Sequence, residues 1–454
     1  MTTKQWTVHP ATSPLRGVIE VPGDKSIGHR ALIFAAIADG TSTLTGLSQG
    51  EDNRATRNAL EAMGVPIEEL SPTSLRVHGV GLDGLSAPSA PLDCGNSGTT
   101  MRLLAGLLVG QRFDSVLCGD TSLSSRPMAR VCKPLRARGG RIDGVFDAAR
   151  NDEVAPLTIR ARTQDLGLSE LEYASPVASA QLKSAVLLSG LYASGSTLVT
   201  EPMMSRDHTE RMLHAMGVPL QTLGPSVFLD PQGEDWDGRL RAIDQDIPSD
   251  PSSALFAIAA AAVVEGSRIA VRRVCINPTR TGALEVLRDM GFSVFHSPKG
   301  DSGGEPVADL VVNSKSGRLR SGARVGGELA VRAIDEIPAL VAIASTVPFR
   351  SEFRDVRELR VKESDRIAAM VAVLKAFGCD VEEHPDGLSF TGQSLVGAHI
   401  DSRGDHRVAM SAVVMALVAK GPTVINDVGC VDTSFPGFAE TLRQLGVSIE
   451  ESVR

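Results

Sequence analysis

Six similar segments divide the chain, and each closes with an amphipathic helix that ends at a glycine. The closing glycines are Gly64, Gly139, Gly217, Gly291, Gly378 and Gly446, which are 75, 78, 74, 87 and 68 residues apart. Glycine is favoured at this cap because it readily adopts the left-handed conformation that ends many helices. The spacing is too long for a solenoid of short repeats. We therefore predict six copies of one structural unit.

The first segment indicates how one copy is built. Apolar spacing predicts helices over 26–38 and 51–63, with a β-branched strand over 41–45 between them and two strand-like stretches within 66–80. Three such units can pack their helices inward and their sheets outward, so six units would form two lobes. The fold class predicted is therefore α/β, with two similar lobes.

Segments rich in Pro, Gly and Asp at 21–24 and 246–250 interrupt the periodic pattern and are the candidate crossings between lobes. If the chain crosses at both, residues 24–247 form one lobe of three repeats, and residues 1–23 with 248–454 form the other. A cleft between lobes is a usual place for a substrate, so we expect the active site there.

Composition limits the partners of this chain. A net charge of −8 argues against a general nucleic-acid binder, and 4% aromatic residues leave little for base stacking. The six cysteines form no Cys-x-x-Cys pair, which indicates reduced thiols in a cytoplasmic protein. The longest apolar run, 254–264, is too short to span a membrane, and residues 1–12 lack the pattern of a signal or transit peptide. We expect a cytoplasmic monomer without membrane or nucleic-acid partners, and residues 300–306 read as a polar surface loop.

Most copies place an arginine in the polar turn where the second helix begins. These arginines are Arg54, Arg126, Arg206, Arg280 and Arg366. A helix N-terminus carries free N–H groups and partial positive charge, so an added guanidinium favours anion binding. The alternative for each arginine alone is an ion pair with a nearby Asp or Glu on the surface. Several such ends together would bind a small, multiply charged anion.

Six motifs carry a family resemblance. They are Pro22-Gly23-Asp24-Lys25-Ser26-Ile27-Gly28-His29-Arg30, Gly95-Asn96-Ser97-Gly98-Thr99-Thr100-Met101-Arg102, Leu123-Ser124-Ser125-Arg126-Pro127-Met128, Ser179-Ala180-Gln181-Leu182-Lys183-Ser184, Arg360-Val361-Lys362-Glu363-Ser364-Asp365-Arg366 and Asp405-His406-Arg407-Val408-Ala409-Met410. Together they resemble, in order from about residue 8 to 450, the 5-enolpyruvylshikimate-3-phosphate synthases (3-phosphoshikimate 1-carboxyvinyltransferases) of the enolpyruvyl transferase family.

The resemblance implies a two-lobed enolpyruvyl transferase fold with six βαβαββ repeats. It also implies a transferase of the shikimate pathway, which leads to the aromatic amino acids. The reaction moves the enolpyruvyl group of phosphoenolpyruvate to the 5-hydroxyl of shikimate 3-phosphate by addition and elimination, releasing phosphate. No metal or organic cofactor is implied. Two anionic substrates would explain local Lys and Arg residues in an acidic protein.

By the same resemblance, two sets of residues bind the substrates. Shikimate 3-phosphate is assigned to Lys25, Ser26, Arg30, Ser179, Ala180, Gln181, Arg206, Asp335 and Lys362. Phosphoenolpyruvate is assigned to Lys25, Asn96, Gly98, Arg126, Gln181, Arg366 and Arg407. Arginine binds carboxylate or phosphate bidentately, and a glycine without Cβ lets a ligand approach the backbone.

The residues Asp335, Glu363 and Lys25 match the family's catalytic groups. Two carboxylates with different neighbours can take different protonation roles, one as the base for the 5-hydroxyl and one at the enol carbon. The alternative is that Asp335 is a helix N-cap and Glu363 an acid of a capping turn. The neighbouring His29 and His208, like His406, are expected to be hydrogen-bonded supports.

Two departures from the family pattern and two rival readings remain. The segment 431–436 lacks a lysine that many relatives carry there, so Lys25 should be the principal lysine at the reacting centre.

One rival is the related transferase acting on UDP-N-acetylglucosamine, which usually has a reactive Cys in the loop matched by 121–125, where this chain has none. The other is a catalytically inactive binding module. Because Gly98 is present, although Ser97 and Leu103 depart from many relatives, we expect sensitivity to glyphosate.

Overall fold

The chain forms two compact units. The computed structural model describes residues 4–162, 167–234, 236–314 and 319–453. The first unit comprises Gly23–Ile247 with Ser302–Glu305, and the second unit comprises the rest of the described chain. Among the described residues, no helix has the length and apolar character needed to cross a membrane.

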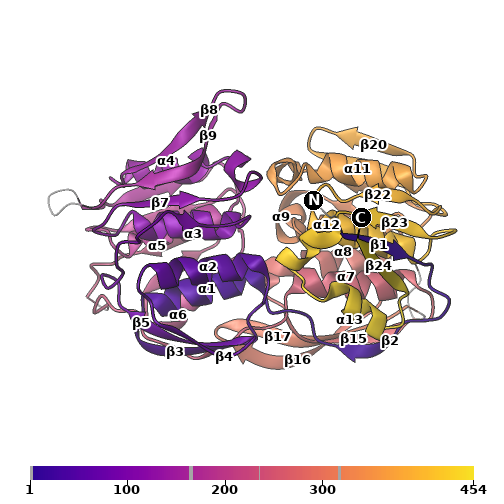
Figure 1. The fold of residues 1–454 in the computed structure, drawn as a ribbon, viewed down its shortest axis with the longest axis horizontal. Helices are drawn as coiled ribbons and strands as arrows, with labels where there is room; N and C mark the ends of the chain where they lie inside the picture. Colours follow the sequence, from indigo (N-terminus) through magenta and orange to yellow (C-terminus); the bar gives the residue numbers. More distant parts are fainter. Residues whose placement is uncertain (1–3, 163–166, 235, 315–318, 454) are drawn as a thin grey trace. The chain divides into compact units, whose positions relative to one another are not determined.

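The first unit contains six α-helices and three four-stranded sheets among its described residues (Figure 1). Its helices are α1 (Lys25–Ala36), α2 (Glu51–Ala62), α3 (Gly98–Leu108), α4 (Ala129–Ala137), α5 (Ala180–Gly190) and α6 (His208–Ala215), with a 3-10 turn η1 (Leu123–Ser125). Its strands are β3 (Asp39–Thr45), β4 (Ile67–Ser71), β5 (Ser74–Val80), β6 (Leu92–Asp93), β7 (Ser115–Cys118), β8 (Ile142–Asp147), β9 (Asp152–Ile159), β10 (Leu171–Ala174), β11 (Thr197–Thr200), β12 (Leu220–Leu223), β13 (Ser226–Leu229) and β14 (Gln245–Asp246).

The second unit repeats this construction. Its helices are α7 (Pro251–Val263), α8 (Gly282–Met290), α9 (Gly327–Ala333), α10 (Ile337–Ala344), α11 (Arg366–Ala376), α12 (His406–Ala416) and α13 (Phe438–Gln444), with 3-10 turns η2 (Pro278–Arg280), η3 (Arg357–Val361) and η4 (Val428–Thr433). Its strands are β1 (Lys4–Val8), β2 (Arg16–Ile19), β15 (Arg268–Cys275), β16 (Val294–Ser302), β17 (Glu305–Asn313), β18 (Arg324–Val325), β19 (Arg350–Phe353), β20 (Val381–His384), β21 (Gly387–Thr391), β22 (His399–Asp401), β23 (Thr423–Asn426) and β24 (Ile449–Val453).

The sheets confirm the predicted repeat. Their strand orders are β14-β3-β5-β4, β6-β7-β9-β8 and β10-β11-β13-β12 in the first unit, and β16-β17-β15-β2, β18-β19-β21-β20 and β22-β23-β1-β24 in the second. In the copy that begins with β6, the chain runs β6, α3, β7, α4, β8, β9, with β6 parallel to β7 and the later pairs antiparallel. Each sheet therefore has the composition expected of a βαβαββ unit.

Three strands pair with partners that are distant in sequence. The edge strand β2 runs parallel to β15, with Arg16 opposite Arg268, and β14 runs parallel to β3, with Gln245 opposite Leu44. The N-terminal strand β1 lies between β23 and β24 and is antiparallel to both. The two chain crossings thus complete sheets as well as connect units.

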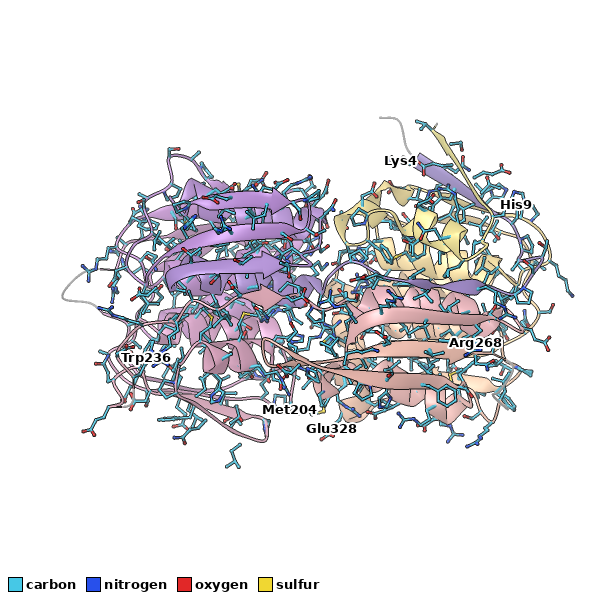
Figure 2. All side chains as sticks on the ribbon, turned by 90° about the horizontal axis from the view of Figure 1, so that it is seen from below. Lys4, His9, Met204, Trp236, Arg268 and Glu328 are labelled. Carbon is cyan, nitrogen blue, oxygen red and sulfur yellow. The ribbon has the colours of Figure 1, made fainter. Side chains whose placement is uncertain are left out.

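In each unit the helices form the interior and the sheets the outside. The central helices α3, α5, α7, α10 and α12 are buried on nearly all sides, as is typical of helices in the interior of a domain. Figure 1 shows α1, α3 and α5 between the sheets of the first unit. Outer strand residues such as Arg268 are exposed, and Figure 2 shows side chains covering this face of its sheet. All six closing glycines have positive φ, from 87° at Gly64 to 100° at Gly446, as the repeat pattern predicts.

The prediction of a polar surface loop over 300–306 is wrong outside its turn, because residues 300–302 end strand β16 and residues 305–306 begin strand β17. Strands β16 and β17 form a hairpin whose turn is Gly303-Gly304, and Glu305 is 1% exposed. The Glu305 carboxylate bonds the buried His208 ring, with Oε1 2.6 Å from Nδ1, and Arg211 Nη1 donates to the Gly304 carbonyl at 3.0 Å. His208 therefore has the supporting role expected of it.

Candidate active site

The N-termini of α1, α3 and α5 carry many of the predicted ligand-binding residues of the first unit. α3 packs against both α1 and α5. Each N-terminus is capped by a side chain: Asp24 accepts from Ile27 N–H at 2.9 Å, Ser97 from Thr100 N–H at 3.1 Å, and Ser179 from Leu182 N–H at 3.4 Å. Adjacent N-termini add their partial positive charges, so this region favours anions.

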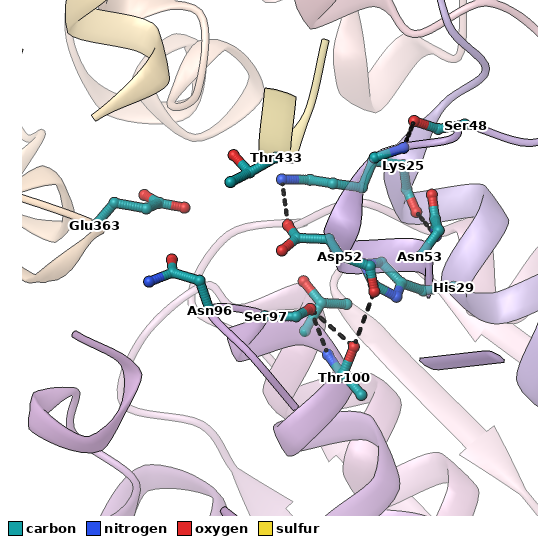
Figure 3. Close-up of polar contacts among 12 residues, drawn as sticks. Lys25, His29, Ser48, Asp52, Asn53, Asn96, Ser97, Thr100, Glu363 and Thr433 are labelled. Atoms are coloured by element: carbon teal, nitrogen blue, oxygen red, sulfur yellow. Dashed lines mark hydrogen bonds and ion pairs between the residues drawn. The ribbon is translucent and has the colours of Figure 1, made fainter. Parts of the chain in front are cut away.

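Lys25 is held by an ion pair with Asp52. Its Nζ lies 2.8 Å from Asp52 Oδ2, and the two side chains are 17% and 12% exposed (Figure 3). Asn53 on the same helix donates from Nδ2 to the Lys25 carbonyl at 3.2 Å. The first turn of α2 therefore fixes both ends of Lys25. Asp52 was not among the predicted site residues, although it lies in the polar turn just before Arg54.

A second group of contacts surrounds Arg126. Its Nη2 donates to Asn96 Oδ1 at 2.5 Å and to Ser122 Oγ at 3.3 Å, while Asn96 Nδ2 donates to Asp120 Oδ2 at 2.7 Å. The structure thus brings Asn96 and Arg126 together, as the assignment to one ligand requires. The two side chains come from different loops, and only the fold makes them neighbours.

Gly98 is the first residue of α3 and lies against two guanidinium groups. A Cβ at this position would lie 3.0 Å from Arg102 Nη1 and 3.3 Å from Arg126 Nη1. These distances are tighter than ordinary van der Waals contact, so any side chain here would displace the arginines. Glycine therefore leaves room for both guanidinium groups at this helix start.

Arg102 connects α3 to α5 and was not among the predicted site residues. Its Nη1 donates to Gln181 Oε1 at 2.7 Å and its Nη2 to the Pro127 carbonyl at 3.1 Å. Gln181 Nε2 in turn donates to Thr99 Oγ1 at 2.8 Å. Arg102 thereby orients Gln181, the residue assigned to both substrates. Its place in the same motif as Gly98 was the available signal.

Arg30 is buried rather than exposed at the surface. Its guanidinium donates to Thr209 Oγ1 at 2.8 Å, to Ser184 Oγ at 2.7 Å and to the Ser26 carbonyl at 2.9 Å. Burial, opposed by the charge of Glu210 and assisted by that of Arg206, lowers the pKa of Arg30 to about 10. The positive charge of Arg206, another predicted residue for the shikimate phosphate, therefore acts on Arg30.

Arg366 is the centre of the predicted site residues in the second unit. It is 1% exposed, and its Nε donates to Asp405 Oδ2 at 2.8 Å. Its Nη2 donates to Glu363 Oε2 at 2.6 Å, and its Nη1 lies 3.5 Å from Asp335 Oδ1. Burial alone would lower the pKa of Arg366, but the three carboxylates raise it well above its ordinary value. Arg366 is therefore always charged.

Asp335 lies between α9 and α10 among cations. Lys362 Nζ is 3.4 Å from its Oδ1, and Arg407 Nη1 donates to its backbone carbonyl at 2.6 Å. The structure thus gathers Asp335, Lys362, Glu363, Arg366 and Arg407. Asp335 is not the N-cap of α10, which is Glu336. Glu363 lies in the turn just before Asp365, the N-cap of α11, as the alternative reading of an acid in a capping turn expects.

Asp405 was not predicted as a site residue, although it begins the motif that contains Arg407. It is fully buried, accepts from Arg407 N–H at 2.9 Å as the N-cap of α12, and accepts from Ser364 Oγ at 2.9 Å. Burial raises the pKa of Asp405, but the Arg366 guanidinium outweighs this and leaves the pKa below its ordinary value. Asp405 therefore connects Arg366 with the N-terminus that carries Arg407.

The five arginines of the repeat pattern do not all serve one purpose. Arg54 is 62% exposed and pairs with Glu51 at 3.4 Å. Arg280 is buried, and its Nη2 donates to Ser252 Oγ at 3.0 Å and lies 3.3 Å from Asp250 Oδ1. The alternative of a surface ion pair therefore holds for Arg54, whereas Arg280 forms its ion pairs in the interior.

Comparisons with known proteins agree over nearly the whole chain. The family model described as EPSP synthase (3-phosphoshikimate 1-carboxyvinyltransferase) matches residues 10–442. The 3-phosphoshikimate 1-carboxyvinyltransferase of Geotalea uraniireducens (strain Rf4) is 48% identical over 443 residues, which cover 97% of this chain and 99% of the relative. That of Xanthomonas axonopodis pv. citri (strain 306) is 47% identical over 448 residues, covering 99% and 98%. A solved structure of EPSP synthase from Acinetobacter baumannii superposes with a TM-score of 0.86 at 41% identity, covering 99% of this chain and 100% of the other.

Proposed function

Since the chain belongs to the EPSP synthase (3-phosphoshikimate 1-carboxyvinyltransferase) family, we propose that it transfers the enolpyruvyl group of phosphoenolpyruvate to the 5-hydroxyl of shikimate 3-phosphate and releases phosphate. The observation that carries the proposal is the contact of Arg366 with both Asp335 and Glu363. One buried cation thus holds two carboxylates whose other neighbours differ.

We assign the substrates as the resemblance implies. Shikimate 3-phosphate would contact Lys25, Ser26, Arg30, Ser179, Ala180, Gln181 and Arg206 in the first unit and Asp335 and Lys362 in the second. Phosphoenolpyruvate would contact Lys25, Asn96, Gly98, Arg126 and Gln181 in the first unit and Arg366 and Arg407 in the second. Clustered helix N-termini and guanidinium groups support this assignment, because both ligands are multiply charged anions.

In the addition step, the 5-hydroxyl oxygen attacks C2 of phosphoenolpyruvate. The hydroxyl proton passes to Asp335, and a proton added to C3 turns the methylene into a methyl group. Glu363 supplies that proton in this scheme. Developing negative charge would be stabilised by preorganised guanidinium groups.

In the elimination step, the bond between C2 and the phosphate oxygen breaks. A proton leaves the methyl carbon, the C2–C3 double bond forms again, and phosphate departs. Here the roles can reverse: Glu363, which delivered a proton to C3, can accept one, and Asp335, which accepted a proton, can deliver one. Lys25, fixed by Asp52 at 2.8 Å, would place a positive charge beside the departing phosphate.

We further propose that the two units close on shikimate 3-phosphate to complete the site, because each carries only part of the assigned residues. We also propose that the enzyme works as a cytoplasmic monomer. Six free cysteines support a reducing compartment. Light scattering on the purified protein tests the monomer.

The decisive experiment is a phosphate-release assay with phosphoenolpyruvate and each acceptor in turn. We expect release with shikimate 3-phosphate and none with UDP-N-acetylglucosamine. Release only with the second acceptor would identify the rival transferase. Binding of both proposed substrates without release would identify an inactive module.

A further inference from the structure

A single buried hydroxyl joins helices α1, α2 and α3, which carry Lys25, Asp52 and Gly98. Thr56 lies on α2 and is 0% exposed. Its Oγ1 is 2.7 Å from His29 Nδ1 on α1 and 2.7 Å from Thr100 Oγ1 on α3. No apolar side chain could make both contacts, so Thr56 fixes α1 and α3 with respect to α2.

The chain of hydrogen bonds continues from Thr100 to two groups at the helix N-termini. Thr100 Oγ1 donates to Ser97 Oγ at 2.8 Å and lies 3.4 Å from the Asp52 carbonyl (Figure 3). Ser97 is the N-cap of α3, directly between Asn96 and Gly98, and Asp52 carries the carboxylate that holds Lys25. The hydroxyl chain therefore ends at the backbone that positions the predicted ligand-binding groups.

The hydrogen bonds that start at His29 have one favourable direction from donor to acceptor. Burial, with the charges of Lys25 and Arg30, lowers the pKa of His29 well below its ordinary value, so the ring is neutral. Among the described residues, His29 Nε2 has no hydrogen-bond partner. A buried N–H donor without a partner is less favourable than a buried lone pair, which places the proton on Nδ1. Nδ1–H then donates to Thr56, Thr56 to Thr100, and Thr100 to Ser97 or Asp52.

Close packing between α1 and α2 supports the same junction. A Cβ at Gly28 would lie 3.0 Å from Asn53 Nδ2, so a side chain there would press on the Asn53 amide. Asn53 also donates to the Lys25 carbonyl. The position of Lys25 relative to α2 is thus set by packing at Gly28 and by hydrogen bonds on both sides of it.

We propose that Thr56 is a positioning residue for phosphoenolpyruvate, acting through His29 and Thr100 to set the spacing between Lys25 and the Asn96–Gly98 turn. This inference rests on the proposed function, because it takes Lys25, Asn96 and Gly98 to bind phosphoenolpyruvate. It assigns no role in shikimate 3-phosphate binding at Ser179, Ala180 or Arg206.

The test is steady-state kinetics of Thr56→Val, in which a methyl replaces the hydroxyl at nearly constant volume. We expect the KM for phosphoenolpyruvate to rise by about 10-fold or more, since misplacement by about 1 Å can reduce rates by about 10²-fold. The KM for shikimate 3-phosphate should rise less than that for phosphoenolpyruvate, because Lys25 is assigned to both substrates whereas Asn96 and Gly98 are assigned to phosphoenolpyruvate alone. Thr56→Ser keeps the hydroxyl and should restore the KM for phosphoenolpyruvate.

A matched control separates positioning from stability. Thr197 in the first unit is also 0% exposed, and its Oγ1 accepts from Arg138 Nη2 at 2.7 Å in a different network. Thr197→Val should lower the melting temperature without a selective rise in the KM for phosphoenolpyruvate. Equal KM values for phosphoenolpyruvate in Thr56→Val and Thr197→Val would overturn the proposal.

Folding failure and an inactive wild type lead to separate outcomes. If Thr56→Val does not fold, Thr100→Val interrupts the same chain one bond closer to Asp52, and an unchanged KM for phosphoenolpyruvate in that variant would overturn the proposal. If the wild-type protein releases no phosphate, the proposed function fails and the positioning role fails with it. An active wild type with an unaffected Thr56→Val refutes the positioning role alone.

Discussion

The guanidinium of Arg366 and the carboxylate of Asp405 form a completely buried pair, with Nε donating to Oδ2 at 2.8 Å. This contact fixes the plane of the guanidinium, so Nη1 and Nη2 are directed to Asp335 and Glu363. Because a buried pair is fixed by its hydrogen bonds, the two proposed catalytic acids both contact a guanidinium that is held in one position. Their different surroundings are the basis for giving them different roles.

The first prediction concerns Asp335→Asn. The amide keeps the shape of the carboxylate and still offers an oxygen acceptor, but it cannot take the proton of the 5-hydroxyl. Turnover should fall by roughly 10²–10⁴-fold while shikimate 3-phosphate binding falls much less. Kinetics and direct titration of shikimate 3-phosphate measure the two effects. Turnover within a few-fold of wild type in a folded variant would transfer the base to Glu363.

Glu363→Gln distinguishes the second acid. It should slow turnover by impairing proton movement at the enol carbon. The specific measurement is exchange of solvent deuterium into the methylene of phosphoenolpyruvate, which we expect to be reduced in this variant. Undiminished exchange would show that another group delivers the proton to C3.

Lys25→Ala should lose phosphoenolpyruvate binding as well as turnover. Lys25 is the principal lysine expected at the reacting centre, and its removal would leave Asp52, an acid 2.8 Å away, beside an anionic substrate. Lys375→Ala, an exposed change in the last turn of α11, is the control and should leave both quantities unchanged. Near-normal phosphoenolpyruvate affinity in Lys25→Ala would show that a different cation takes the role.

Gly98→Ala should weaken phosphoenolpyruvate binding. The added Cβ would lie 3.0 Å from Arg102 and 3.3 Å from Arg126, and the guanidinium groups would have to move. We expect the KM for phosphoenolpyruvate to rise roughly 3- to 10-fold. The wild type, with Gly98, should be inhibited by glyphosate in competition with phosphoenolpyruvate. Gly167→Ala, where the Cβ would meet nothing within 4 Å, is the matched control.

Lys183→Met should destabilise the first unit. Lys183 is 1% exposed and lies 2.9 Å from Glu201 and 2.7 Å from Glu210, which are buried as well. Removing the cation leaves two buried carboxylates without their partner, and the free energy of unfolding should fall by about 3–5 kcal/mol. Urea denaturation measures this. A loss below about 1 kcal/mol would show that the carboxylates find other partners.

The same variant should have a characteristic pH dependence. Burial raises the pKa of Glu210 above its ordinary value, and Lys183 partly opposes this rise. Without Lys183 the folded-state pKa should rise further. A carboxyl with a raised folded pKa stabilises the protein below its unfolded pKa, and this contribution is lost as pH rises through the folded pKa. The stability deficit of Lys183→Met should therefore narrow as pH is lowered and widen as it is raised.

Closure of the two units is tested by solution scattering. We expect the radius of gyration to decrease when shikimate 3-phosphate is added, because the assigned residues lie on both units. Closure would exclude water and strengthen each ionic contact. An unchanged radius of gyration at saturating ligand would count against closure.

Local signals predicted much of the fold. The six glycine caps depend only on neighbouring residues, and all six adopt the left-handed conformation. The hairpin at 300–306 was missed because Glu305 is buried by His208, about a hundred residues earlier in the chain, and no local pattern reveals such a partner. A polar segment reads as a loop until its distant partner is known.

The site was predictable by motif but its internal contacts were not. Lys25, Arg126 and Arg366 stand in recognisable segments. The partners Asp52 and Asp405 were not predicted, since acids are frequent at helix starts and most only cap them. Arg280 was grouped with the arginines expected to bind an anion, but it forms a buried structural ion pair instead. Repeat position alone does not distinguish a ligand-binding arginine from a structural one.

The placement of β1 and β2 has a consequence for synthesis on the ribosome. These strands are made first, but β2 pairs with β15 and β1 pairs with β23 and β24, which are made last. The main part of the first unit, Gly23–Ile247, is therefore an insertion between β2 and α7, and with Ser302–Glu305 it can fold while β1 still lacks its partners β23 and β24. We expect nascent chains to protect the first unit from protease before β1 becomes protected.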